Sequence, residues 1–265
     1  MNKEMQYQSI SKGFSKIYEH YEVLSQNSLI DKAMRQQVYN HINRFIKPNS
    51  RILELNSGSG IDAVYFASRN HKITATDISE GSKTYINKKI KDLGLNNLNF
   101  KHYSFLELEK LKPQKYNYAF SNFGGLNCTN EIEVMAKSLN AVLEDNAVVT
   151  MVVMGKYYPW DWIYALKGKF KRAFIRFNKN GTTANIEGEA VTTYYHTPKQ
   201  FKNKMSSYFN YISSENLGVC YPSVNHTSIT KFKKFIKFLI VVDSKLRQLI
   251  PVGIGDYYIM SFRKK

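Results

Sequence analysis

A short apolar strand that runs directly into a glycine-containing loop constrains this chain most. Residues 51–55 read Arg-Ile-Leu-Glu-Leu, and Asn56-Ser-Gly-Ser-Gly60 follows at once. The next residues place alanine, valine and phenylalanine at helical spacing. Glycine lets a backbone approach a ligand where a side chain would clash, and the start of a helix offers unpaired N–H groups. The order strand, glycine loop, helix therefore predicts a ligand-binding turn.

The first 155 residues continue this alternation of strands and helices. Residues 1–48 are expected to be helical, and strands are expected at 51–55, 72–76, 98–102, 116–120 and 147–153. A helix is expected to run from about residue 157 to about Phe174, and Thr197-Pro198 is expected to begin another. Further strands are expected in the Thr-rich segment 182–196, at 211–217 and at 256–263. Alternation of this kind predicts a parallel sheet that binds its ligand at the carboxyl ends of the strands. We predict an α/β fold with a doubly wound, seven-stranded, mostly parallel sheet, an antiparallel C-terminal edge strand, a helical N-terminal segment and cap insertions.

Two acidic residues flank the predicted ligand turn. Glu54 ends the first strand and adds a carboxylate to the crevice, which suits a positively charged ligand better than a phosphate. Asp77 ends the second strand, 17 residues past Gly60 (77 − 60), where an acid can accept hydrogen bonds from both hydroxyls of a ribose. The glycines alone leave an alternative open. The run from Gly58 to Ala63 also fits the G-x-G-x-x-G/A pattern of nicotinamide cofactor sites.

With these residues in place, LELNSGSGIDAVYFA followed by ITATDIS resembles motifs I and II of the class I methyltransferases that use S-adenosylmethionine (SAM). The resemblance covers roughly residues 14–155, with the last strand included. It implies a cofactor site along the carboxyl ends of the strands. The residues that the resemblance assigns to SAM are Tyr21, Glu54, Asn56, Gly58, Gly60, Asp77, Ile78, Ser104, Phe105, Asn122 and Phe123.

Each of these positions has an implied role. Glu54 and the loop glycines would line the methionine part of SAM, with Tyr21 closing over that end. Asp77 would bind the ribose and Ile78 the adenine ring. Ser104 and Phe105 would lie near the adenine amino group. Asn122 and Phe123 would lie beside the transferable methyl.

The chain also departs from the family pattern. Asn56 replaces the first glycine of the loop, Ser104 replaces an acid after the third strand, and Glu22 replaces the aspartate of the usual Tyr-Asp pair. None of these changes removes Asp77 or the two later glycines. SAM therefore remains the expected cofactor, and we divide the chain into an N-terminal helical cap (1–48), a SAM-binding Rossmann-like core (49–155) and cap insertions with the completing strands (156–265).

No fixed catalytic constellation is expected, because SAM already carries an activated methyl on its sulfonium. His196, His226 and Tyr21 are the candidates for a base or a substrate-orienting group, since histidine titrates near neutral pH. Each histidine taken alone is more typical of packing or of surface exposure. No metal-ligand spacing is present, and Cys128 and Cys220 form no disulfide framework, which fits a reducing cytoplasm.

These features predict a SAM-dependent methyltransferase that acts on a small-molecule acceptor, with a lipophilic or acidic natural product as the expected class. A methyltransferase for RNA or for a peptide or protein is the alternative, and an NAD(P)-dependent oxidoreductase is a more distant one. The net charge of +17 favours anionic partners. Nucleic acid is not expected, since no RNA-binding module is appended and Asn122-Phe-Gly-Gly does not resemble the N/D-P-P-Y pattern of base-amino methylases.

Residues 230–250 form a basic amphipathic segment with two open interpretations. The apolar stripe comprises Phe232, Phe235, Ile236, Leu239, Val242, Leu246 and Leu249, and lysines lie largely off it. The helix is either an active-site cap with solvated lysines or a peripheral contact with an anionic membrane. The N-terminus has no apolar signal region, and no apolar run reaches the roughly 20 residues that span a bilayer. The oligomeric state is not indicated.

Overall fold

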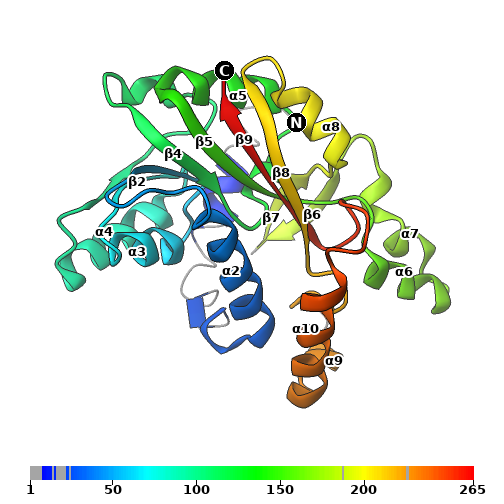
Figure 1. The fold of residues 1–265 in the computed structure, drawn as a ribbon. Coiled ribbons are helices and arrows are strands. Elements are labelled where there is room, and N and C mark those ends of the chain that lie inside the picture. Colours follow the sequence, from blue (N-terminus) through cyan, green and yellow to red (C-terminus); the bar gives the residue numbers. More distant parts are fainter. Residues whose placement is uncertain (1–7, 14, 16–21, 24, 187, 225–226) are drawn as a thin grey trace.

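A seven-stranded sheet forms the centre of the molecule in a computed structural model that describes residues 8–13, 15, 22–23, 25–186, 188–224 and 227–265. The strand order is β3-β2-β1-β4-β5-β9-β8 (Figure 1). The strands are β1 (Arg51–Leu55), β2 (Lys72–Thr76), β3 (Leu98–Lys101), β4 (Tyr116–Ser121), β5 (Leu143–Met154), β8 (Phe209–Leu217) and β9 (Tyr257–Lys264).

Strands β1 to β5 run parallel, and β9 runs antiparallel to both β5 and β8. The predicted fold class is confirmed. Within it, the antiparallel C-terminal strand lies between β5 and β8, so β8 forms the edge. The physical reason is that β9 is apolar on both faces: Tyr258, Ile259, Met260 and Phe262 are all buried. A strand buried on both faces belongs inside a sheet.

Alternation along the strands gives the sheet two cores. Leu53 and Ala119 point to one face and pack with α5 (Ile132–Val142) and α8 (Pro198–Met205), while Ile52 and Phe120 point to the other. The second face is covered by α2 (Leu29–Ile42), α3 (Ile61–Ala67) and α4 (Glu80–Leu93). Successive side chains of a strand face opposite sides, so both faces must be apolar when helices cover both.

Short-range signals define several helix ends. Thr197 and Gln200 form a capping box with Pro198 in the first turn, so α8 begins where the sequence predicts. The helix expected to run from about 157 to 174 is instead divided into α6 (Pro159–Leu166) and α7 (Phe170–Ala173). Gly168 between them has a φ of +70°, a left-handed conformation that ends α6.

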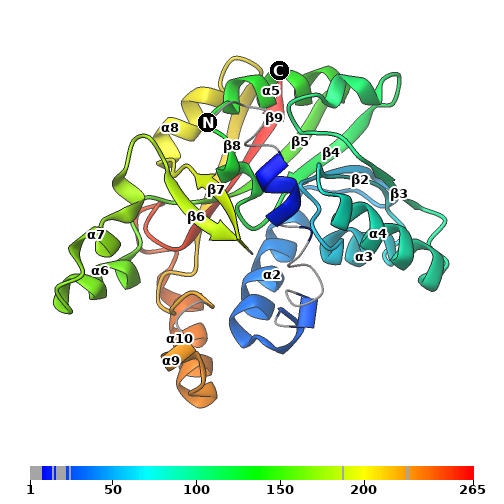
Figure 2. The ribbon, with the colours of Figure 1, turned by 180° about the vertical axis from the view of Figure 1, so that it is seen from behind.

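Several of the segments after β5 lie at one end of the sheet (Figure 2). They comprise α6, α7, the 3₁₀ turn η3 (Ile175–Phe177), the hairpin of β6 (Thr182–Ile186) and β7 (Glu189–Thr193), α9 (Thr227–Thr230) and α10 (Lys233–Leu246). Met154, at the carboxyl end of β5, pairs with Tyr257 at the start of β9. These segments therefore gather at the carboxyl end of β5. The division of the chain into an N-terminal cap, a core and cap insertions, with boundaries at residues 48 and 155, stays a prediction.

A buried polar chain ties α2 to the middle of the sheet. His41 Nε2 lies 2.8 Å from Ser261 Oγ, which lies 2.8 Å from Thr150 Oγ1, and that oxygen lies 2.5 Å from the Tyr118 hydroxyl. The other ring nitrogen of His41 pairs with Glu215 on β8. Every member of the chain between Tyr118 and His41 thus has a partner, as buried polar groups require.

Glu215 ends this series of buried hydrogen bonds. Its replacement should lower the free energy of unfolding in a pH-dependent way. Burial raises the pKa of the Glu215 carboxyl, but the hydrogen bond and charge of His41, with the charge of Arg44, hold that pKa below its usual value. Glu215→Gln should therefore lower the free energy of unfolding by about 1–3 kcal/mol at pH 7. A carboxyl whose pKa is depressed by folding contributes stability above its unfolded pKa of about 4.3, and the contribution is lost as pH falls through the folded pKa.

Urea unfolding of wild type and variant at pH 7 and at descending pH measures this difference, which should shrink below about pH 4. Glu144→Gln is the matched control, because the Glu144 side chain is 31% exposed and its Arg51 partner 56%. Its effect should stay within about 1 kcal/mol. Equal losses for the two variants at pH 7 would contradict the assignment.

Candidate active site

The loop between β1 and α3 is built from left-handed residues. Asn56, Gly58 and Gly60 have φ values of +47°, +55° and +76°. Gly60 is also the N-cap of α3, and a Cβ on it would lie 2.7 Å from Cγ1 of Ile86. Both the conformation and the packing on α4 therefore require glycine at this position. The predicted strand, loop and helix are confirmed at this point of the chain.

Glu54 lies at the base of this loop with an unsatisfied carboxylate. The side chain is buried, and its Oε2 has no hydrogen-bond partner among the described residues. Burial raises the pKa of Glu54 well above its usual value, and the charges of Asp62 and Asp77 raise it further, against the opposing effect of Arg35 and Lys89. A buried carboxylate in such a setting is stabilised by a ligand that brings a positive charge.

Asp77 connects the loop to the start of α4. Its Oδ2 accepts a hydrogen bond from Gly58 N at 3.0 Å, and its Oδ1 accepts one from Ser79 N at 2.9 Å. Burial raises the pKa of Asp77, and these backbone hydrogen bonds oppose that rise. A carboxylate has about four acceptor positions, so the two hydrogen bonds to Gly58 N and Ser79 N do not by themselves saturate Asp77.

Asp62 is a site residue that the sequence reasoning missed. Its Oδ1 accepts hydrogen bonds from Arg35 Nη1 and from the Tyr39 hydroxyl, both at 2.5 Å. Its Oδ2 accepts from Asn122 Nδ2 at 3.0 Å. The carboxylate thus joins α2, α3 and the loop after β4. The available signal was an acid in the first turn of a helix that leaves a glycine loop.

Asn122 and Phe123 follow β4 in a strained turn beside the loop. Phe123 and Gly124 have φ values of +48° and +76°. Phe123 N donates to Asn122 Oδ1 at 2.9 Å, and the guanidinium of Arg35 lies 4.5 Å from the centroid of the Phe123 ring. The structure brings these residues together with Glu54 and Asp62, while their contact with SAM stays a prediction.

Asn56 is accommodated by the absence of a side chain at Gly125. Its Oδ1 accepts a hydrogen bond from Ser121 Oγ at 2.8 Å. A Cβ on Gly125 would overlap the Cβ, Cγ and Nδ2 of Asn56. Asparagine tolerates the left-handed conformation better than other non-glycine residues. The missing first glycine of the loop is therefore matched by a glycine in η2 (Gly125–Cys128).

The residues assigned to the adenine lie near the ends of β2 and β3. The Ile78 carbonyl accepts a hydrogen bond from His102 Nε2 at 2.8 Å. Ser104 Oγ accepts from Leu106 N at 3.1 Å, so the serine closes a turn, and Phe105 packs against the core on the α5 face. Their positions at the carboxyl ends of neighbouring strands agree with the assignment, which stays a prediction.

Described parts of the N-terminal segment lie over the loop. Ser15 Oγ is 2.8 Å from Ser79 Oγ and accepts from Gly81 N at 3.0 Å. Lys89 Nζ donates to Glu22 Oε1 and to the Ser59 carbonyl, each at 2.8 Å. The segment before α2 thus contacts both α4 and, through Lys89, the glycine loop. Tyr21 lies outside the described residues.

Of the histidine candidates, His226 also lies outside the described residues, and His196 is buried. His196 lies just before α8 with its ring 6.3 Å from that of Phe201, and its Nε2 has no hydrogen-bond partner in the described part of the chain. Burial lowers the pKa of His196 to about 4, and the charge of Lys204 adds to this. The imidazole is therefore neutral and a weak base at neutral pH, and a catalytic role stays a prediction.

Arg176 fixes the segment that follows β5. Its Nε donates to Asp161 Oδ2 and its Nη2 to Asp256 Oδ1, both at 2.6 Å. Its Nη1 donates to the carbonyls of Gly155 and Asp256. One buried guanidinium therefore attaches α6 and η3 to the ends of β5 and β9. The fork geometry of arginine suits such a junction.

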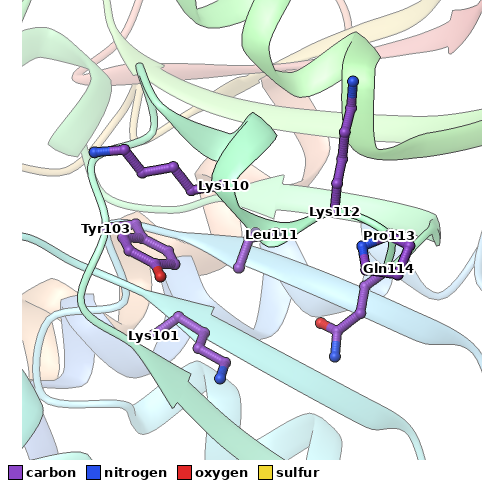
Figure 3. A pocket seen from close by; sticks show the side chains of 7 residues that line it. All are labelled: Lys101, Tyr103, Lys110, Leu111, Lys112, Pro113 and Gln114. Atoms are coloured by element: carbon purple, nitrogen blue, oxygen red, sulfur yellow. The ribbon is translucent and has the colours of Figure 1, made fainter.

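A shallow pocket lies elsewhere, near the end of β3 and the 3₁₀ turn η1 (Leu108–Leu111) (Figure 3). It is lined by Lys101, Tyr103, Lys110, Leu111, Lys112, Pro113 and Gln114. None of the residues assigned to the cofactor or to catalysis lines it. It therefore has no part in the site built around Glu54 and Asp77.

The pairing of Asn56 with Gly125 predicts a coupled pair of substitutions. Gly125→Ala should lower the free energy of unfolding by about 1–3 kcal/mol, because the new methyl overlaps the Asn56 side chain. Adding Asn56→Gly removes all three overlapping atoms, so the double variant should recover most of that loss. Urea unfolding of wild type, both single variants and the double variant gives the coupling energy. Simple additivity of the two effects would show that the residues do not depend on each other.

Comparisons with known proteins agree with this geometry. Residues 52–146 match the model of a family described as "Methyltransferase domain". No curated protein sequence gives a significant match. Among solved structures, the DhpI–SAH complex has a TM-score of 0.60 at 12% identity, with 99% of this chain and 98% of that chain covered.

Two further structures contain bound small molecules. A Burkholderia thailandensis 1,6-didemethyltoxoflavin-N1-methyltransferase with bound 1,6-didemethyltoxoflavin and S-adenosylhomocysteine has a TM-score of 0.57 at 15% identity, covering 97% of this chain and 88% of that one. A Streptomyces coelicolor A3(2) geranyl diphosphate C-methyltransferase has a TM-score of 0.57 at 9% identity, covering 89% and 79%. Residues 52–146 therefore match a methyltransferase domain, and the chain shares the Rossmann-like fold of these methyltransferase structures.

Proposed function

We propose that this protein transfers a methyl group from SAM to a small-molecule acceptor. The observation that carries the proposal is the Glu54 carboxylate, which is buried at the base of the glycine loop with an oxygen that has no partner in the described part of the chain. The methionine end of SAM bears a sulfonium and an ammonium group. A cofactor with positive charge at this place would stabilise the ionised form of Glu54, which burial and the charges of Asp62 and Asp77 disfavour.

The residues around Glu54 fit SAM in the proposed arrangement. Glu54 and the loop from Asn56 to Gly60 would hold the methionine end, and the remaining acceptor positions of Asp77 would hold the ribose. When bound, SAM supplies a methyl activated by the adjacent sulfonium. The protein's own contribution is to fix the cofactor, to align the acceptor and to exclude water. Asn122 and Phe123 are held rigidly by Asp62 and Arg35, which suits an aligning role.

We infer a lipophilic or acidic acceptor. Two structures with the same fold contain bound small molecules, 1,6-didemethyltoxoflavin and geranyl diphosphate. The net charge of +17 favours an acidic acceptor, and exposed aromatic side chains near the site favour a lipophilic one. The low cysteine content of the sequence supports the cytoplasm as the compartment.

The nicotinamide alternative is weakened by the same carboxylates. A dinucleotide would place its pyrophosphate at the start of α3, where Glu54 and Asp62 are both buried. Like charges at short distance in a low-dielectric region repel strongly. An RNA or protein acceptor is supported mainly by the net charge, a feature that a small acidic acceptor satisfies as well.

Asp77→Ala tests the proposed cofactor site. Loss of the charge-assisted hydrogen bonds to the ribose should cost about 1.5–3 kcal/mol of affinity for S-adenosylhomocysteine, or roughly 10- to 150-fold in Kd. Isothermal calorimetry measures this loss, and circular dichroism verifies that the variant is folded. Asp92→Ala, on the exposed side of α4, is the matched control and should bind like wild type. Unchanged affinity in Asp77→Ala would mean that the ribose is held elsewhere.

A further inference from the structure

Exposed apolar side chains are concentrated at the end of the molecule that carries the candidate site. Of twenty large apolar side chains exposed in the described part of the chain, fifteen lie in residues 157–177 or 232–252. The first group belongs to α6, α7 and η3, and the second to α10 and its flanks. Both groups project from the carboxyl end of β5 (Figures 1 and 2). Apolar surface gathered in this way marks an interaction site.

Helix α10 packs part of its apolar stripe against the protein and leaves several large apolar side chains exposed. Ile236 and Asp243 are buried, and Asp243 Oδ1 accepts hydrogen bonds from Val219 N at 2.8 Å and Cys220 N at 2.9 Å. Phe235, Phe238 and Leu246 follow helical spacing on another side and are exposed, Phe238 by 62%. The helix is therefore anchored through Ile236 and Asp243 and turns Phe235 and Phe238 toward solvent. A cap over the site would instead bury these two aromatic side chains.

The second group forms a similar projection. Leu166, at the end of α6, is 87% exposed, and Trp162, Phe170 and Phe174 are exposed beside it. The buried guanidinium of Arg176 holds this projection to the sheet through Asp161 and Asp256. The exposed apolar groups thus stand on a fixed support.

Both projections are strongly basic. Residues 156–180 contain seven lysines and arginines and one acid, and residues 227–252 contain six and one. The two acids, Asp161 and Asp243, are engaged by Arg176 and by backbone amides. The surface that the projections present is therefore apolar and cationic together. That combination matches the acyl and headgroup layers of an anionic membrane.

We propose that α10 and the α6–α7 projection dock on an anionic phospholipid surface, so that the site end of the protein faces the membrane. A second copy of this chain fits less well, because a symmetric contact would bring the two basic surfaces together. Nucleic acid would satisfy the lysines, and its bases could stack on the aromatic rings, but it offers no apolar partner to the exposed aliphatic side chains of Leu166 and Leu249. Entry of a lipid-soluble acceptor from this surface follows if the proposed function holds.

Co-sedimentation of the full chain with vesicles tests the docking surface. Vesicles of phosphatidylcholine with about 30 mol% phosphatidylglycerol should bind the protein, and pure phosphatidylcholine should bind it far less. Phe235→Ser with Phe238→Ser, and separately Lys234→Glu with Lys237→Glu, should each weaken binding about tenfold or more. Leu166→Ser should weaken it through the second projection.

Helix α4 offers matched controls, because its last turns lie toward the amino end of β3, away from the site. Leu93→Ser removes a side chain that is 57% exposed, and Lys88→Glu with Lys91→Glu makes the same charge change. These variants should bind vesicles like wild type. All variants should retain affinity for S-adenosylhomocysteine, a readout that separates failure of the docking surface from failure of the proposed function.

Three outcomes would overturn the proposal. The first is no preference for anionic vesicles, and the second is equal weakening by the α4 controls. The third is a dimer in light scattering that dissociates in the Phe235→Ser, Phe238→Ser variant, which would assign the surface to a second copy of the chain.

Discussion

The burial of three carboxylates around one left-handed loop is the constraint on which the rest of the site depends. Asp77 accepts hydrogen bonds from Gly58 and Ser79, and Asp62 accepts from Arg35, Tyr39 and Asn122. These bonds fix the loop, α2 and the turn after β4 relative to one another. Glu54 has an oxygen without a partner among the described residues. Burial disfavours the ionised form of Glu54, and the cationic end of the proposed cofactor would stabilise it.

The same device attaches the segments that surround the site. Asp256 and Asp161 bind Arg176 beneath α6 and η3, and Asp243 binds two backbone amides beneath α10. Each attachment places its acid inside and leaves basic and apolar residues outside. The charge of the proposed docking surface is thus a consequence of how these helices are anchored. The exposed apolar side chains of α10 and the candidate site lie at the same end of the sheet.

Local patterns were sufficient to predict the sheet strands, the loop and Asp77. Short apolar runs and the glycines determine these features within a few residues. The sequence could not predict the role of Asp62, because Arg35, Tyr39 and Asn122 reach it from distant segments. Gly125 beside Asn56 and the place of β9 inside the sheet also arise from tertiary contacts. The break between α6 and α7 differs from these features, because Gly168 is a local signal in the sequence.

Calorimetric titration with SAM across a pH series tests the role of Glu54 most directly. Burial raises the pKa of Glu54 in the free protein, so bound positive charge must compete with a proton. The affinity for SAM should therefore rise with pH above about 4.5 until Glu54 is ionised, and Glu54→Gln should abolish this rise. NAD(P) should give no binding heat. Affinity for SAM that is independent of pH, or binding of NAD(P) in its place, would contradict the account.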